Sequence, residues 1–242
     1  MKSWTRTLNL DDAHTLLAMA TPGRDLEDWA EACHAELPAL SMPRRRELVR
    51  MLRDGYLDLD GQGRIANGLF LHVYSASPAS AQIDLVRTQW ALTHPLSLIA
   101  AERLVAPALD CGEPDIPLDD VEALVAEHLA TGSAESRRKT RTVLLGALEG
   151  IGVLDTSGTG QHRSLRAAHG RPHPVTFGYL TRRELAERGV DGMLATEVVE
   201  TGLGIRLTLC GMGHARSCLA WNLEHGVLVQ RGDEIRAADT RA

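Results

Sequence analysis

The stretch SAESRRKTRTVLLGALEGIGVLDTSGTGQHRSLR, residues 133–166, decides the fold class of this chain. It opens on a serine suited to cap a helix, and helical apolar spacing then continues to residue 150. A glycine-containing corner leads into a short apolar run, a polar turn, and a second short run that carries arginine. This order predicts a helix followed by a β-hairpin.

The same order of events occurs at three places, over residues 52–65, 148–166 and 223–236. In the first two, another helical segment lies one short turn upstream, at 24–36 and 118–130. Helix, short turn, helix and hairpin is the outline of a winged helix-turn-helix. We therefore predict a mainly α protein with winged helix-turn-helix-like units, in up to three copies.

Apolar periodicity predicts further helices, and strands are few and short. The helices are expected after Asp11 and Asp12, over 77–90 with Ser77 and Pro78 as N-cap and first residue, from Pro95 onward, and over 174–189 and 213–226. The segment CGEPDIP at 111–117 is typical of a turn or linker. We expect an N-terminal domain over 1–110 with the first unit, and a C-terminal domain over 117–242 with the second and third.

Basic residues gather where such units contact DNA. A helix enters the major groove by its N-terminal end while the wing lies along the backbone, so cations belong at the start of the second helix and on the hairpin. The predicted DNA-binding residues are Arg44, Arg45, Arg46, Arg50 and Arg64 in the first unit, and Arg137, Arg138, Lys139, Arg141, Arg163 and Arg166 in the second. The third unit offers only His214 and Arg216, so we expect it to serve packing or association.

The overall charge hides this distribution. The 242 residues carry a formal net charge of −6, yet residues 133–188 hold ten Lys or Arg against five acids and residues 43–66 hold six against four. Polyanion binding is therefore compatible with the composition. The competing interpretation is that these helix faces are merely solvated.

Sequence motifs for catalysis and metal binding are absent. The chain contains no G-x-x-x-x-G-K-[ST], G-x-G-x-x-G, H-E-x-x-H or G-x-S-x-G. Cys210, His214 and Cys218 have helical spacing, but small residues on a packed face explain them better than a metal site, which needs three or four converging ligands. We expect a protein that is not an enzyme and has no cofactor and no metal.

The chain shows no signal for export or membrane insertion. Its first residues, MKSWTRTLNLDDAH, lack an apolar core, and the most apolar stretch, 91–109, is interrupted by charged residues and proline. Four cysteines without a C-x-x-C spacing fit a reducing compartment. We expect a cytoplasmic protein with no membrane partner; the sequence does not define its oligomeric state.

The chain also resembles the BrxA family of BREX phage-defence systems, from about residue 13 to 199. The resemblance rests on LLAMATPGRDLEDWAEAC, SMPRRRELVRML, LVRTQW and SAESRRKTRTVLLGALEGIGVLD; the tail from Gly202 to Ala242 extends beyond it. It implies a compact, largely helical, winged-helix protein that binds duplex DNA, with 44–46 and 137–141 facing the DNA.

These observations lead to one hypothesis and two alternatives. The hypothesis is a non-catalytic double-stranded DNA-binding component of a BREX-like defence system, with other defence proteins as further partners. One alternative is a protein-interaction scaffold of a defence complex, and the other is a winged-helix transcriptional repressor, which would dimerise and select a palindromic operator.

Overall fold

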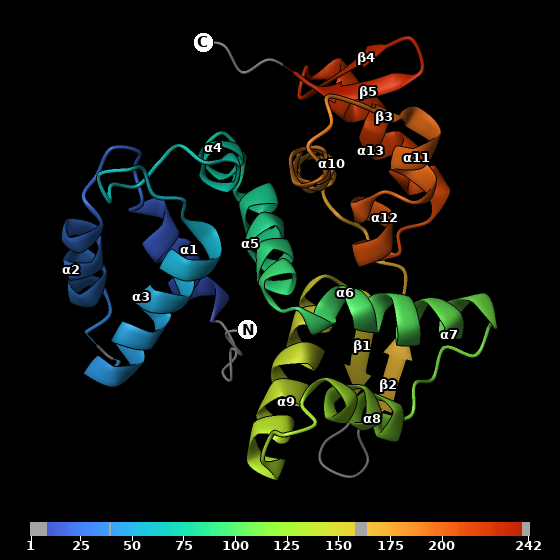
Figure 1. The fold of residues 1–242 in the computed structure, drawn as a ribbon, viewed down its shortest axis with the longest axis horizontal. Coiled ribbons are helices and arrows are strands. Elements are labelled where there is room, and N and C mark those ends of the chain that lie inside the picture. Colours follow the sequence, from blue (N-terminus) through green and yellow to red (C-terminus); the bar gives the residue numbers. More distant parts are fainter. Residues whose placement is uncertain (1–8, 39, 158–163, 239–242) are drawn as a thin grey trace.

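The computed structural model of the chain describes residues 9–38, 40–157 and 164–238. It is mainly helical, with two small antiparallel sheets. In Figure 1 the chain forms three lobes, and helix α5 lies between them. Helix α5 packs against α1, α3 and α4 on one side, and against α9 and α10 on the others. The mainly α class predicted from the sequence is confirmed.

The first lobe contains the first of two segments in which two helices are joined by a short turn. Its elements are α1 (Leu10–Ala18), α2 (Leu26–Glu36), α3 (Met42–Tyr56) and α4 (Leu69–Ser75). Asp25 caps α2, because its side chain accepts a hydrogen bond from the backbone N–H of Glu27 at 2.8 Å. The hairpin expected after α3 forms no ladder; it consists of one isolated bridge, Leu59 with Ile65.

The second lobe follows α5 (Ala79–Thr93) and contains the second segment. Its elements are α6 (Leu96–Ala100), the π-helix η1 (Ala101–Val105), α7 (Ala106–Asp110), α8 (Leu118–His128), α9 (Ala134–Gly150), β1 (Leu154–Ser157) and β2 (Ser164–Ala167). The two strands pair antiparallel from Leu154 with Ala167 to Ser157 with Ser164, so the hairpin expected after α9 is present. Helix α5 begins at Ala79 with Pro78 as its N-cap, one residue later than predicted.

The third lobe contains the remaining elements. They are α10 (Pro174–Arg188), β3 (Met193–Leu194), α11 (Ala195–Glu200), α12 (Leu203–Thr208), α13 (Met212–Glu224), β4 (Leu228–Arg231) and β5 (Glu234–Ala237). Strand β5 lies between β3 and β4 and pairs antiparallel with both, so the hairpin expected after α13 is present within a sheet of three strands.

Two hydrophobic clusters stabilise the molecule. The larger one runs from Ala13 to Leu207 and includes residues on both sides of 111–117, and the smaller one lies within the third lobe around Phe177 and Ile235. The predicted boundary at 111–117 is a turn, but the core is continuous across it.

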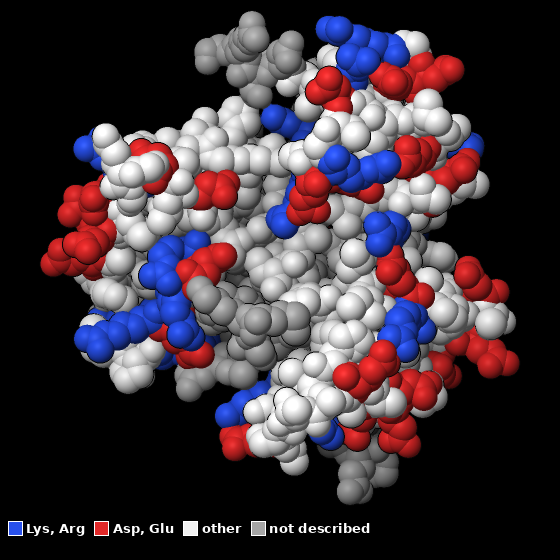
Figure 2. Space-filling model, viewed as in Figure 1, with Lys and Arg blue, Asp and Glu red and all other residues white. Residues whose placement is uncertain are grey.

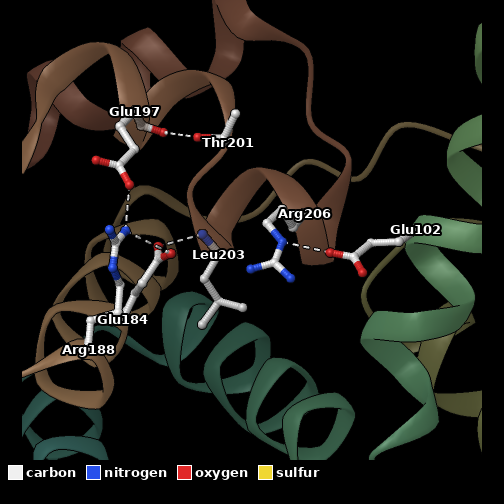
Figure 3. A network of polar contacts seen from close by, with 7 residues as sticks. All are labelled: Glu102, Glu184, Arg188, Glu197, Thr201, Leu203 and Arg206. Carbon is white, nitrogen blue, oxygen red and sulfur yellow. Dashed lines mark hydrogen bonds and ion pairs between the residues drawn. The ribbon is translucent and has the colours of Figure 1, made fainter.

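A polar network joins the third lobe to the second (Figure 3). The nearly buried carboxylate of Glu184 on α10 accepts a hydrogen bond at 2.6 Å from the backbone N–H of Leu203, the first residue of α12. Arg206 on α12 then donates through Nε to Glu102 of η1, also at 2.6 Å. Helix α12 is thereby held between α10 and the π-helix.

Within the described ranges, every helix is too short or too polar to cross a lipid bilayer.

Candidate nucleic-acid interface

The first two lobes each contain two helices joined by a turn, with identical spacing in both. Helices α2 and α8 begin at Leu26 and Leu118, which are 92 residues apart, and the same interval separates the caps Ser41 and Ser133 of the following helices. Core positions follow the same interval, and each of these pairs is buried in both copies: Leu48 and Thr140, Met51 and Val143, Leu52 and Leu144, Tyr56 and Leu148.

Each segment is completed by a short stretch of chain that precedes its first helix and pairs with the hairpin. In the first copy the backbone N–H of Ile65 donates to the carbonyl of Arg24, and in the second the N–H of Ile116 donates to the carbonyl of Leu165. An isolated bridge accompanies each of these contacts, Asp25 with Arg64 and Asp115 with Arg166, but the aspartates lie 90 residues apart and the arginines 102, so the interval of 92 does not extend to the bridges. An aspartate lies opposite an arginine in both.

Two of the predicted DNA-binding arginines point into the protein. The guanidinium of Arg45 donates to the carbonyls of Leu40, His34 and Pro38 at 2.7–2.8 Å. Arg137, the corresponding residue 92 positions later, donates to the carbonyls of Leu129 and Ala130 at 3.1 and 2.8 Å. Both side chains thus satisfy carbonyls at the C-terminal end of the preceding helix, where the helix dipole also favours a cation. Their role is to fix the turn between the two helices.

Three further cations form ion pairs with nearby glutamates. Arg44 pairs with Glu47 at 3.2 Å and Lys139 with Glu135 at 2.6 Å, each within one helix, and Arg141 on α9 pairs with Glu122 on α8. Such pairs at the protein surface contribute little to stability, so a phosphate could replace the carboxylate. Arg50 is exposed on α3 and also has a contact within the chain.

The remaining four described cations lie on the second helices and on the hairpins. Arg46 and Arg138 lie 92 residues apart at the same position of the second helix, and Arg64 and Arg166 lie opposite the aspartates on the hairpins. All four are exposed, and their side chains make no hydrogen bond or salt bridge within the part of the chain that the structure describes. Arg163 lies outside the described residues, as does His162.

In the second copy, a groove lies beside Arg138. It has a volume of about 510 Å³ and lies between α8 and α9, with Arg137, Arg138, Arg141 and Glu122 around a floor of alanine and valine side chains. The first copy has Val49 where the second has Arg141, and Ala30 where the second has Glu122. The two copies therefore share the arginine framework but differ in the charges beside it.

Acidic side chains are interspersed with these cations over the surface. Figure 2 shows basic side chains gathered over α3, with acidic ones next to them, and a more mixed distribution over the second and third lobes. The N-terminal ends of α3 and α9 both lie toward the lower edge of the same view in Figure 1. On the face drawn in Figure 2, basic side chains lie between acidic ones rather than in one continuous basic patch.

The last long helix of the third lobe, α13, has no cluster of arginines at its N-terminal end. Helix α13 begins at Met212 after its N-cap Gly211, and the Met212 side chain is 51 % exposed. The Nε2 atom of His214 lies 2.9 Å from the carbonyl oxygen of Pro172, so this histidine faces the protein. Arg216 is exposed.

The cysteines and histidines considered in the sequence analysis do not come together in an arrangement that could bind a metal ion. No group of three His, Cys, Asp or Glu side chains with metal-binding geometry occurs among the described residues. The thiol of Cys218 is buried, which raises its pKa to about 12, whereas metal binding requires the thiolate. His173 instead caps α10 by accepting from the N–H of Val175, and Nδ1 of His169 lies 2.7 Å from the carbonyl oxygen of Leu209.

Comparison of the chain with protein-family models, with curated proteins and with solved structures finds no match.

Proposed function

We propose that the first two units are winged helix-turn-helix modules that bind duplex DNA. The observation that carries this proposal is an exposed arginine that recurs at the same position of the second helix in both units, each time with another exposed arginine on the adjoining hairpin. An arginine kept only for solubility has no reason to recur at one structural position. A DNA-contacting arginine does, since both modules would meet the same phosphate backbone.

The proposed docking follows from helix geometry. The N-terminal ends of α3 and α9 enter the major groove, where Arg46 and Arg138 contact phosphate or the guanine edge in bidentate fashion. Arg64 and Arg166 lie on the hairpins and neutralise the adjoining backbone. Arg44, Lys139 and Arg141 would exchange their glutamate partners for phosphate, which makes affinity dependent on salt.

The sharpest test reverses two of the exposed charges. The variant Arg46→Glu with Arg138→Glu is expected to lose retention of a DNA duplex in a gel-shift assay while its thermal transition stays that of the parent chain. Arg137 is left intact because its guanidinium fixes the turn before α9. A matched control, Arg87→Glu with Arg171→Glu, makes the same charge change at exposed positions outside both units and should bind DNA almost normally.

Retention of DNA by the Arg46→Glu, Arg138→Glu variant at the level of the control would contradict the proposal. An equal loss in both variants would contradict it too, because binding would then depend on net charge alone. Binding to scrambled sequence, together with a size measurement, separates this function from that of a dimeric repressor with one operator.

The second candidate function is a protein-interaction scaffold. The observation that favours it is the exposed apolar side chains of the third lobe, Leu194 and Met212, each 51 % exposed, on a lobe whose helix starts lack clustered cations. A scaffold would show no salt-sensitive DNA binding and would co-purify with a larger partner.

We further propose that the chain acts as a non-catalytic cytoplasmic component of a BREX-like defence system. The support is the resemblance of its segments to the BrxA family together with the arginine pattern. Genes for a methyltransferase, a large ATPase and an alkaline-phosphatase-like protein beside this one are expected; their absence would contradict the assignment to that system.

A further inference from the structure

A second arginine-lined site lies in the third lobe, away from the units proposed to bind DNA. A cavity of about 590 Å³ opens between the C-terminal half of α10 and the hairpin β4–β5. Figure 1 shows this hairpin at the outer end of the lobe. The volume falls within the range of small-molecule sites in proteins.

Three arginines from three different elements line the cavity. Arg182 comes from α10, Arg231 from the end of β4 and Arg236 from β5. Arg236 donates to the carboxylate of Glu234 at 2.6 Å, and Asp191 lies in the lining, so three arginines stand beside two acids among the described residues. Arg182 is partly buried, which lowers its pKa, and it also has a contact within the chain. An anion bound in the cavity would add charge-assisted hydrogen bonds from these guanidinium groups.

Apolar side chains line the same cavity. Leu185 lies about one turn after Arg182 on α10, Val190 follows the helix, and Val229 lies two residues before Arg231 on β4. Val190 is 39 % exposed, so this part of the lining is accessible to a ligand. A ligand that matches the lining carries an anionic group and an apolar body. Asp191 could accept a hydrogen bond from a hydroxyl or amino group on that body.

We propose that this cavity binds a small phosphorylated molecule of nucleoside monophosphate size. Its phosphate contacts Arg182, Arg231 and Arg236, and its ring packs against Leu185 and Val229. Arginine suits this task because its planar donors match phosphate oxygens in pairs. The site is formed by residues of the third lobe alone and does not depend on the DNA-binding proposal.

Calorimetric titration of the full chain tests the proposal, with AMP, adenosine and inorganic phosphate as probes. We expect AMP to bind and to raise the thermal midpoint, phosphate to bind more weakly, and adenosine to bind weakest. Arg231→Gln removes an exposed guanidinium and should weaken AMP binding about tenfold, the loss of one charge-assisted contact. Arg216→Gln, an exposed arginine of the same lobe outside the cavity, should bind AMP as the parent does.

Absence of AMP and phosphate binding at millimolar concentration would overturn the proposal, as would equal binding by Arg231→Gln and the parent. Nucleic-acid phosphate is the other source of this chemistry, and competition distinguishes the two. In the Arg46→Glu, Arg138→Glu background, duplex DNA should leave bound AMP in place. Displacement of AMP by the duplex would assign the cavity to nucleic acid and overturn the small-molecule site.

Discussion

At the residue scale, the structure divides the predicted arginines by what each guanidinium contacts. Arg45 and Arg46 are neighbours in sequence, yet the first donates to three carbonyls and the second projects into solvent. The sequence predicts cations at the start of α3, but it does not say which of them the preceding helix requires. That depends on the path of the turn, which only the folded chain defines.

Removing Arg45 should therefore cost stability, whereas removing Arg46 should not. Arg45→Ala leaves carbonyls of Leu40, His34 and Pro38 without their charged donor, and we expect a loss of about 2 kcal/mol in the free energy of unfolding. Arg46→Ala, an exposed substitution, should change it by less than about 0.5 kcal/mol. Urea unfolding measures both, and equal stability of the two variants would refute the assigned role.

His94 provides a prediction on pH. Its ring lies almost fully buried after α5, and this burial lowers its pKa from 6.5 to about 4. In the unfolded chain the ring takes up a proton below pH 6.5, but in the folded chain only near pH 4, so acid favours unfolding over this interval. Through His94 alone, the free energy of unfolding should fall by about 3 kcal/mol between pH 7 and pH 4.

The variant His94→Gln removes the titrating group and serves as the comparison. The difference in unfolding free energy between parent and variant, followed by urea unfolding from pH 7 to pH 4, should shrink as pH falls. Parallel curves over that range would show that His94 is not responsible.

At the element scale, long helices with strong caps could be predicted from sequence and short ones could not. The pattern over 133–150 predicts α9 because Ser133 caps it and its apolar spacing is regular. Helices α11 and α12, six residues each, have no comparable signal. Short helices gain little from their own hydrogen bonds and depend on contacts from elsewhere in the fold. For α12 the contact comes from Glu184, some twenty residues upstream.

Substitution of Glu184 should therefore loosen α12. Glu184→Gln keeps the size of the side chain but replaces the carboxylate that accepts the hydrogen bond from the N–H of Leu203. We expect the free energy of unfolding to fall by about 1–2 kcal/mol. Amide exchange at residues 203–208 should speed up more than exchange in α10. Glu187→Gln on the same helix is the control, since Glu187 is 55 % exposed and pairs with Arg183 only along the surface. Unchanged exchange in α12 would speak against a capping role for Glu184.

At the scale of the whole molecule, charge averages are less informative than charge positions. A net charge of −6 alone would argue against a polyanion partner, but an exposed arginine recurs at the same position of a helix in two lobes, with another on each adjoining hairpin. The sequence predicts the two basic segments and the turn at 111–117. It does not predict that one core runs across that turn, because the packing of α5 against all three lobes involves residues far apart in the chain.

If these four exposed arginines each neutralise one phosphate, and Arg44, Lys139 and Arg141 each exchange a glutamate for a phosphate, the affinity for duplex DNA should fall with salt at a log-log slope of about −6. The Arg46→Glu, Arg138→Glu variant should show a slope smaller in magnitude by about 2. Fluorescence anisotropy across a salt series gives both values. A slope near zero for the parent chain would exclude the proposed electrostatic docking.

The interval of 92 residues that relates α2 and α3 to α8 and α9 makes each helix pair a reference for the other. A change placed at one position can be repeated at its counterpart within the same polypeptide, under the same solvent and at the same concentration. Differences such as Val49, which is buried, against Arg141, which pairs with Glu122, then show where the two helix pairs have different surroundings.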